Sequence, residues 1–209
     1  MDARDKQRII ERYKVRLEAY GVDVRALASG NRERQQMRFK VLADVGNLED
    51  QSILDIGCGF ADFYTYLKDQ GLHVQYTGID ICPQFINICQ EQFPDLTFLV
   101  ADIQTDTVPG TFDYIVSSQT FNNALAYNDN EKVLRDVLTR SYALCRKGVV
   151  IDMLTKYVDF KEPHLHYYSP EEIFSFCKSL TKRVALRHDY PLFEFAVYLY
   201  KDFQGWGKK

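Results

Sequence analysis

Hydrophobic positions recur along the chain with two different periods. Up to residue 46 they recur at steps of three and four, which is typical of amphipathic helices; the first such stripe comprises Ile9, Ile10, Tyr13, Leu17 and Tyr20. From residue 51 onward, short apolar runs alternate with amphipathic stretches, as in βαβ units around a parallel sheet. We therefore expect a helical extension over residues 1–46, part of the same domain, followed by an α/β domain over residues 47–209.

Two helices are expected in the extension. The first ends at Gly21, and the second runs from about residue 32 to 45, with Asn31 as its N-cap. Such helices preceding an α/β domain are placed to fold over its ligand site, so we expect them to form a lid.

Five apolar runs in the central region predict the strands of a parallel sheet. They are continuous rather than alternating, which fits strands that are covered on both faces. The strands are expected at 52–56, 75–80, 96–100, 112–117 and 148–153, and the helices between them at 60–70, 83–92 and 129–144.

The last segment carries a different pattern. Ser169-Pro170 followed by two acidic residues predicts a helix that runs to about Lys178. Two β-rich runs then follow, at 182–189 and 192–200, and the alternation in the second indicates an antiparallel pair at the sheet edge. The predicted fold class is α/β, doubly wound, with helices on both faces.

Composition places the chain among globular proteins. Of its 209 residues 46% are hydrophobic and 26% charged, and no run reaches the roughly 18 apolar residues of a membrane span. The first ten residues also lack the apolar core of a signal peptide, so we expect a cytoplasmic protein with no membrane partner. The five cysteines form no CxxC pair, which favours reduced, buried thiols and no metal site.

Charge is distributed unevenly. Residues 1–40 carry 11 Lys and Arg against 6 Asp and Glu, whereas the remainder carries 15 basic and 23 acidic residues. An acidic body argues against a protein that coats nucleic acid.

The stretch ILDIGCGFADFY, residues 53–64, reads as an apolar strand, a glycine turn and a helix. Glycine lets the backbone turn sharply at Gly57 and Gly59 and approach a ligand lying across the strand ends. Two further strands end in acids. Asp80 is placed to accept both hydroxyls of a ribose, and Asp102 to accept from an adenine amino group, with Ile81 and Ile103 against the ring.

The ligand expected at these acids carries no phosphate. A dinucleotide site would place a third glycine at position 62 and a pyrophosphate at the helix N-terminus. Position 62 is Asp, close to Asp55, and two carboxylates would repel a pyrophosphate. The same acids suit a ligand with a sulfonium and an ammonium group, so the charges favour S-adenosylmethionine over NAD.

These motifs together, with GIDIC, ADIQ and FDYIVSSQTFNN, resemble the nucleotide-binding motifs of class I S-adenosylmethionine-dependent methyltransferases over residues 50–155. The resemblance implies a seven-stranded sheet whose last strand is antiparallel. It also implies site residues at matching positions: Asp55, Gly57 and Gly59 at the methionine end of the cofactor, Asp80 at the ribose, Asp102 and Ile103 at the adenine, and Ser118 or Gln119 facing cofactor or substrate. Ala61 stands where a third glycine is frequent in the family.

Methyl transfer from a sulfonium depends mainly on alignment, so a general base is needed only when the acceptor must lose a proton. His166 and Tyr168 are the first candidates for that base, because their segment is expected to cross the strand ends. Arg38 is a candidate for a bidentate bond to the methionine carboxylate.

The expected substrate is a small molecule, and the protein a monomer or homodimer. A nucleic-acid methyltransferase is the first alternative, motivated by the basic first forty residues; the loop 117–123 lacks the proline of enzymes that stack a flipped base. The sequence also leaves open a protein that binds S-adenosylmethionine without catalysis, and a dehydrogenase.

Overall fold

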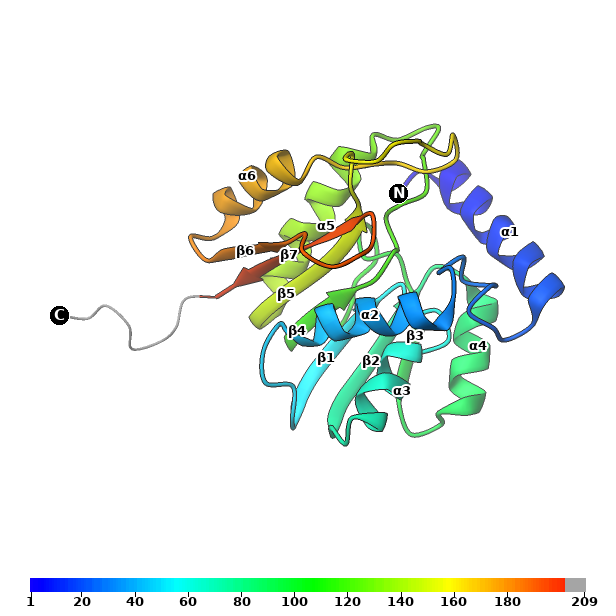
Figure 1. Cartoon of the computed structure of the whole chain (residues 1–209). Coiled ribbons are helices and arrows are strands. Elements are labelled where there is room, and N and C mark those ends of the chain that lie inside the picture. Colours follow the sequence, from blue (N-terminus) through cyan, green and yellow to red (C-terminus); the bar gives the residue numbers. More distant parts are fainter. Residues whose placement is uncertain (202–209) are drawn as a thin grey trace.

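A single seven-stranded sheet forms the centre of the computed structural model, which describes residues 1–201 (Figure 1). The strands lie in the order β3-β2-β1-β4-β5-β7-β6. Their bounds are β1 Gln51–Ile56, β2 Val74–Asp80, β3 Thr97–Val100, β4 Phe112–Ser117, β5 Cys145–Leu154, β6 Val184–Arg187 and β7 Glu194–Tyr200.

Strands β1 to β5 are parallel to one another, and β7 pairs antiparallel with both β5 and β6. The strand order reverses direction between β1 and β4, which opens a crevice at their carboxyl ends. The strands predicted at 182–189 and 192–200 therefore do form an antiparallel pair at one side of the sheet. Antiparallel β7 confirms the sheet implied by the family resemblance.

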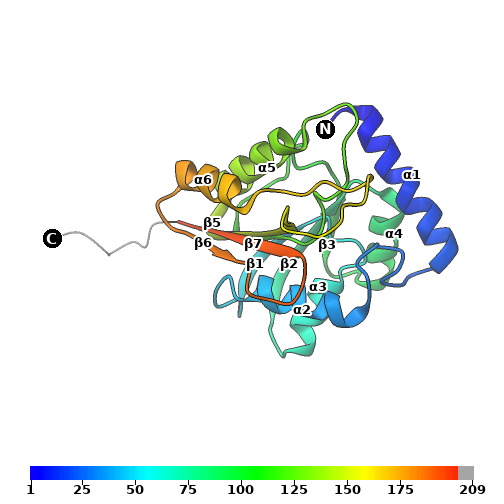
Figure 2. The same ribbon diagram turned by 45° about the horizontal axis from the view of Figure 1, so that its top comes forward.

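Helices cover both faces of the sheet (Figure 2). On one face, α2 (Arg32–Ala43), α3 (Asp62–Asp69) and α4 (Pro83–Gln92) share a buried cluster with the strands. On the other, α5 (Asn130–Leu144) and α6 (Pro170–Leu180) pack into a second cluster. Neighbouring residues of a strand serve opposite faces: Tyr114 and Val116 of β4 belong to the first cluster and Ile115 to the second. This double coverage explains the continuous apolar runs of the sequence.

Local sequence signals set the helix ends. The Asn31 side chain accepts from the backbone N–H of Arg34 at 2.9 Å, and the Ser169 hydroxyl accepts from that of Glu172 at 3.4 Å. Helix α1 (Ala3–Tyr20) ends at Gly21, whose φ of +64° lies in the left-handed region that glycine adopts without strain. All the predicted helices and strands of the described chain are confirmed, with boundaries moved by a few residues.

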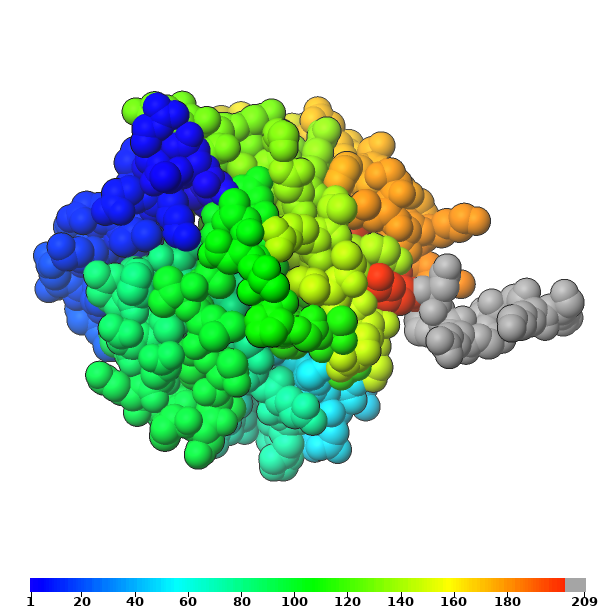
Figure 3. Space-filling view, turned by 180° about the vertical axis from the view of Figure 1, so that it is seen from behind, coloured from blue at the N-terminus to red at the C-terminus, as the bar shows by residue number. Residues whose placement is uncertain are grey.

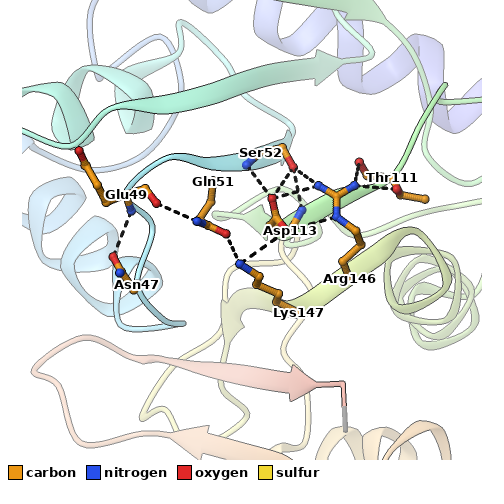
Figure 4. Close-up of polar contacts among 8 residues, drawn as sticks. All are labelled: Asn47, Glu49, Gln51, Ser52, Thr111, Asp113, Arg146 and Lys147. Carbon is orange, nitrogen blue, oxygen red and sulfur yellow. Dashed lines mark hydrogen bonds and ion pairs between the residues drawn. The ribbon is translucent and has the colours of Figure 1, made fainter. Parts of the chain in front are cut away.

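A polar cluster holds the amino ends of β1, β4 and β5 together, at the edge of the sheet opposite the glycine turn (Figure 4). Asp113 accepts from the backbone N–H of Ser52 at 3.0 Å and from the guanidinium of Arg146 at 3.0 and 3.2 Å. The hydrogen bond from Arg146 is the main reason why the pKa of Asp113 lies below its usual range. This cluster joins three strands and leaves the carboxyl edge free for a ligand.

The two helices of the N-terminal extension occupy different places. Helix α2 is part of the core, since Phe39, Val41 and Leu42 are buried in the same cluster as the strands. Helix α1 lies away from the sheet, beside α4 (Figures 1 and 2). Its Tyr13 ring meets Phe85 of α4 at a centroid distance of 5.8 Å. The cover over the carboxyl edge is therefore supplied by α1 and the segment that follows it.

All five cysteines are buried and free of disulfides. In the described part of the chain no helix combines the length and apolarity that a membrane crossing requires.

Candidate cofactor and active site

A pocket opens at the carboxyl ends of β1, β2 and β4 and reaches under α1. The walls come from the glycine turn, from the ends of β2 and β3, from the loop after β4 and from the N-terminal helices. Of the predicted cofactor-binding residues the pocket wall contains Asp55, Gly57, Gly59, Asp80, Ile81, Asp102, Ile103, Ser118 and Gln119.

The glycine turn needs glycine at two positions. Gly57 has a φ of +72° and Gly59 a φ of +55°. A Cβ at Gly57 would overlap the Thr120 side chain, and one at Gly59 would lie 2.9 Å from a methyl carbon of Leu27. Ala61, where a third glycine is frequent, also has a positive φ of 59° and precedes α3. The turn therefore brings the backbone of Gly57 and Gly59 into the pocket wall. At the end of the turn, Ala61 adopts a left-handed conformation that is strained for a residue with a Cβ.

Asp55, near the end of β1, is a buried acid in the pocket wall. Burial raises its pKa to about 7, and the hydrogen bond from the Tyr76 hydroxyl, at 2.5 Å, opposes that shift. The nearby carboxylates of Asp80, Asp152 and Asp62 raise the pKa further. A cation in the pocket would relieve this repulsion.

Asp80 ends β2 and is held in place by the backbone. Its carboxylate accepts from the N–H of Gly59 at 3.1 Å and from that of Cys82 at 2.9 Å. Burial raises its pKa to about 6, while these two N–H groups act in the opposite direction. The glycine turn and the acid of the next strand are thus one connected unit.

The third acid, Asp102, lies just after β3. Its carboxylate lies 3.0 Å from the terminal amine of Met1, and both residues line the pocket. From behind, the blue N-terminal segment lies beside the green segment after β3, with a gap between them (Figure 3). Ile103 and Phe85 are buried and also line the pocket, and such apolar side chains suit an aromatic ring.

The loop after β4 is fixed by Asp152, a site residue that the sequence pattern did not reveal. Asp152 of β5 is 1% exposed and accepts from the Ser118 hydroxyl at 2.8 Å, the Gln119 N–H at 2.7 Å and the Gln119 amide at 3.1 Å. Gln119 has a φ of +58°, a strained conformation that these bonds stabilise. The only sequence signal was a single acid inside the apolar run GVVIDM.

The pocket wall fits the chemistry of S-adenosylmethionine. Four carboxylates line it, from Asp55, Asp62, Asp80 and Asp102. Asp62 accepts from Arg32 at 3.1 Å and from the Gln35 amide at 2.9 Å. Its carboxylate thus puts a negative charge in the first turn of α3, where a pyrophosphate would bind. An acidic pocket with an apolar end suits a cationic, phosphate-free nucleoside.

Arg38 makes contacts that differ from its predicted one. Its guanidinium forms a buried bidentate pair with Glu194 of β7, both distances being 2.7 Å, and donates to the carbonyl of Ser29. It is not among the residues that line the pocket, whereas Gln35 of the same helix is. A bond from Arg38 to the cofactor stays a prediction; in the structure its fork joins α2 to β7.

His166 and Tyr168, the predicted general bases, lie outside the pocket wall. Tyr168 is 1% exposed and donates its hydroxyl to the carbonyl of Phe121 at 2.8 Å. His166 packs against that ring with a centroid distance of 4.5 Å, and its Nε2 lies 3.5 Å from Glu131. Both residues brace the loop after β4, and a catalytic role for either stays a prediction.

Comparison with known proteins identifies the family. A family model described as a methyltransferase domain matches residues 53–141. A protein of Mycobacterium tuberculosis named as a methyltransferase is 33% identical over 158 residues, which is 72% of this chain and 93% of that protein.

Solved structures share the fold. Magnesium protoporphyrin IX methyltransferase from Synechocystis, solved with S-adenosylhomocysteine, superposes with a TM-score of 0.68 at 14% identity, over 95% of this chain and all of that one. A TehB-like S-adenosylmethionine-dependent methyltransferase from Corynebacterium glutamicum gives 0.61 at 22% identity, over 93% of this chain and all of that one.

The chain belongs to the class I S-adenosylmethionine-dependent methyltransferases. The resemblance found in the glycine turn and the acids of the strand ends is thereby confirmed.

Proposed function

We propose that the protein transfers a methyl group from S-adenosylmethionine to a small-molecule acceptor. The observation that carries this proposal is the acidic pocket at the carboxyl edge of the sheet, where Asp55 and Asp80 meet the glycine turn. The cofactor supplies an electrophilic methyl group on a sulfonium.

The residues of the chain bind and align. Asp80, which two backbone N–H groups hold in the pocket wall, would accept the ribose hydroxyls, and Asp102 and Ile103, in the same wall, would bind the adenine. Asp55 and the glycine turn would bind the cationic end. Holding donor and acceptor in line contributes about 7–11 kcal/mol when the geometry is good, so these positioning contacts are sufficient for most of the rate.

The acceptor is expected beside Ser118 and Gln119, whose loop is fixed by Asp152. We propose no obligatory base, because the candidates His166 and Tyr168 lie outside the pocket wall. Five reduced, buried thiols support a cytoplasmic protein, which we expect to act as a monomer or homodimer.

The test is incubation with S-adenosylmethionine labelled in its methyl group and an extract of small metabolites, followed by mass spectrometry. A labelled product that depends on the protein supports the proposal. Calorimetric binding of S-adenosylmethionine with no transfer to any extract would instead support a protein that only binds the cofactor.

A nucleic-acid methyltransferase is tested separately by filter binding with bulk tRNA and DNA. The expectation is that neither is retained at physiological salt, because the body of the protein is acidic. Retention of either polymer together with label transfer to it would replace the small-molecule proposal.

A further inference from the structure

A second groove lies next to the cofactor pocket, between α1 and the loops that follow β4 and β5. The loop before α6 passes close to the N-terminal half of α1 in both ribbon views (Figures 1 and 2). The backbone N–H of Ala124 donates to the carbonyl of His164 at 3.0 Å, which ties the two loops together. The groove is therefore built from three separate segments of the chain.

Three arginines of α1 line this groove: Arg8, Arg12 and Arg16. They are spaced four residues apart, so their side chains lie on one face of the helix. His164 lines the groove as well. This row of guanidinium groups concentrates cationic donors on a protein whose net charge is −3.

The contacts of these arginines do not fully neutralise their positive charge. Arg12 donates to the neutral amide oxygen of Asn123 at 2.8 Å, and Arg16 donates to the main-chain carbonyl of Arg25. Arg8 lies 3.3 Å from Asp5. The acidic residues of the groove wall are Asp5 and Glu11, so three guanidinium groups face two carboxylates.

The Asp5 carboxylate binds the loop 126–128 as well as Arg8. Its carboxylate accepts from the backbone N–H of Ala126 at 2.8 Å, the N–H of Tyr127 at 3.0 Å and the amide of Asn128 at 3.2 Å. These hydrogen bonds outweigh burial and hold the pKa of Asp5 below its usual value. Because the donors of the loop share the Asp5 carboxylate, Asp5 competes only weakly with a bound anion for Arg8.

The groove and the cofactor pocket meet at two places. Ile9 lines both of them. Phe121 lies in the pocket wall and Asn123 in the groove wall, and two residues of chain span at most about 7 Å. The groove and the pocket are thus neighbours along α1 and the loop after β4.

We propose that this groove binds the anionic group, a carboxylate or phosphate, of the methyl acceptor, with Arg8 and Arg12 as its main partners. Guanidinium forks bind such groups bidentately, so they hold the acceptor in one orientation. The inference rests on the proposed function and deepens it by naming the class of acceptor as small anions.

The experiment titrates citrate and, in a separate arm, inorganic phosphate into the protein saturated with S-adenosylhomocysteine, using calorimetry at pH 7.5 and low salt. We expect at least one of the two to bind with a Kd below about 10 mM. The variant Arg8→Gln/Arg12→Gln should raise that Kd at least about tenfold, since charged hydrogen bonds are lost. The arm that binds more tightly distinguishes a carboxylate from a phosphate site.

Lys6→Gln/Lys14→Gln is the matched control, because both lysines lie on α1 outside the groove wall and their loss also removes two positive charges. It should leave the Kd of the probe unchanged, and neither variant should change the affinity for S-adenosylhomocysteine. Glutamine at position 12 keeps a donor for Asn123, which protects the docking of α1.

The inference is overturned if neither probe binds the native protein, or if the double variant binds the probe as the native protein does. Retention of tRNA on a filter that the double variant abolishes would also overturn it, since the arginines would then serve a polymer. Failure of S-adenosylhomocysteine to bind would refute the proposed function instead, and titration of the protein without it would still report on the groove.

Discussion

At the scale of single residues, the site depends on carboxylates that the fold holds in an unfavourable environment. Asp80 is the clearest case, because two backbone N–H groups fix its position while burial raises its pKa to about 6. Asp80→Asn keeps the shape of the side chain and removes one charged acceptor. We expect the Kd for S-adenosylmethionine to rise at least about tenfold, measured by calorimetry.

Asp69→Asn is the control, since Asp69 is an exposed acid at the end of α3. Below pH 6 the native protein should also bind more weakly, because the protonated Asp80 accepts fewer hydrogen bonds, and this loss should be smaller in Asp80→Asn. Equal affinity of Asp80→Asn and the native protein at pH 8 would rule out the ribose role.

Asp55 illustrates the cost in stability of an acidic pocket. Its pKa is about 7 in the folded protein, against about 3.9 for an unperturbed aspartate. Between these two values the folded state binds more protons than the unfolded state, so the free energy of unfolding falls as pH rises through that window. The cost is fully present above pH 7.

Asp55→Asn should therefore stabilise the unliganded protein at pH 8, by about 2 kcal/mol after allowance for relaxation. The asparagine oxygen can still accept from the Tyr76 hydroxyl. At pH 5 the gain should fall by more than half. Urea unfolding followed by circular dichroism at both pH values measures this, and a gain that does not change with pH would contradict the assigned cause.

A single site residue could be predicted from the sequence only where its own position in the chain marks its role. Gly57, Asp55 and Asp80 were found from the sequence because the ends of parallel strands meet at one edge. Asp152 was missed because its partners, Ser118 and Gln119, lie more than thirty positions away in the chain. Nothing local marks an acid that orders a distant loop.

At the scale of elements, helix α1 is attached at both ends to different parts of the site. Near its start, Asp5 accepts from three donors of the loop 126–128, and Arg12 bonds to Asn123. Near its end, Leu17 packs with Tyr13 against a small apolar cluster that includes Phe60 and Phe85. This helix covers the pocket while making little contact with the sheet.

Asp5→Ala should therefore loosen the lid and leave the core intact. The lost charge-assisted bonds leave backbone N–H groups of the loop unpaired, at a cost of about 1–3 kcal/mol. We expect faster hydrogen exchange confined to α1 and residues 121–128, together with faster release of S-adenosylmethionine. Mass-spectrometric hydrogen exchange measures the first and stopped flow the second.

Glu49→Ala is the matched control, because the Glu49 carboxylate also accepts from a backbone N–H, that of His73, but at the amino edge of the sheet, away from α1. It should leave both rates unchanged. If Asp5→Ala instead accelerated exchange throughout the sheet, α1 would be part of the core and not a lid.

The elements themselves were predictable because their signals are periodic and local. Runs such as SILDI and FDYIVS gave strand positions to within a few residues, and Asn31 and Ser169 gave two helix starts. The split within the N-terminal extension was not predicted, because the sequence alone does not say which surface each of these two helices packs against. Which stripe meets the sheet depends on tertiary contacts that the sequence pattern does not encode.

At the scale of the whole molecule, the choice of ligand follows from where opposite charges lie. The carboxylates of the cofactor pocket belong to the net −8 of the chain beyond residue 40, whereas the groove arginines lie on the basic first forty residues. The cationic cofactor and the anionic acceptor that we propose would thereby be drawn to neighbouring sites. A dinucleotide, with two phosphates, would meet the carboxylates.

Ligand-induced thermal stabilisation tests this arrangement in the intact protein. A ligand present at 100 times its Kd stabilises the folded state by about 2.7 kcal/mol, and a chain of this size gains about 2–4 °C in Tm per kcal/mol. S-adenosylhomocysteine should thus raise Tm by about 5–11 °C. NADH at the same concentration should leave Tm unchanged, because Asp62 and its partners occupy the position of a pyrophosphate. Asp62→Gly, which restores the glycine of a dinucleotide turn and removes a charge, should weaken the discrimination against NADH. A comparable rise in Tm with both ligands in the native protein would show that the pocket does not select by charge.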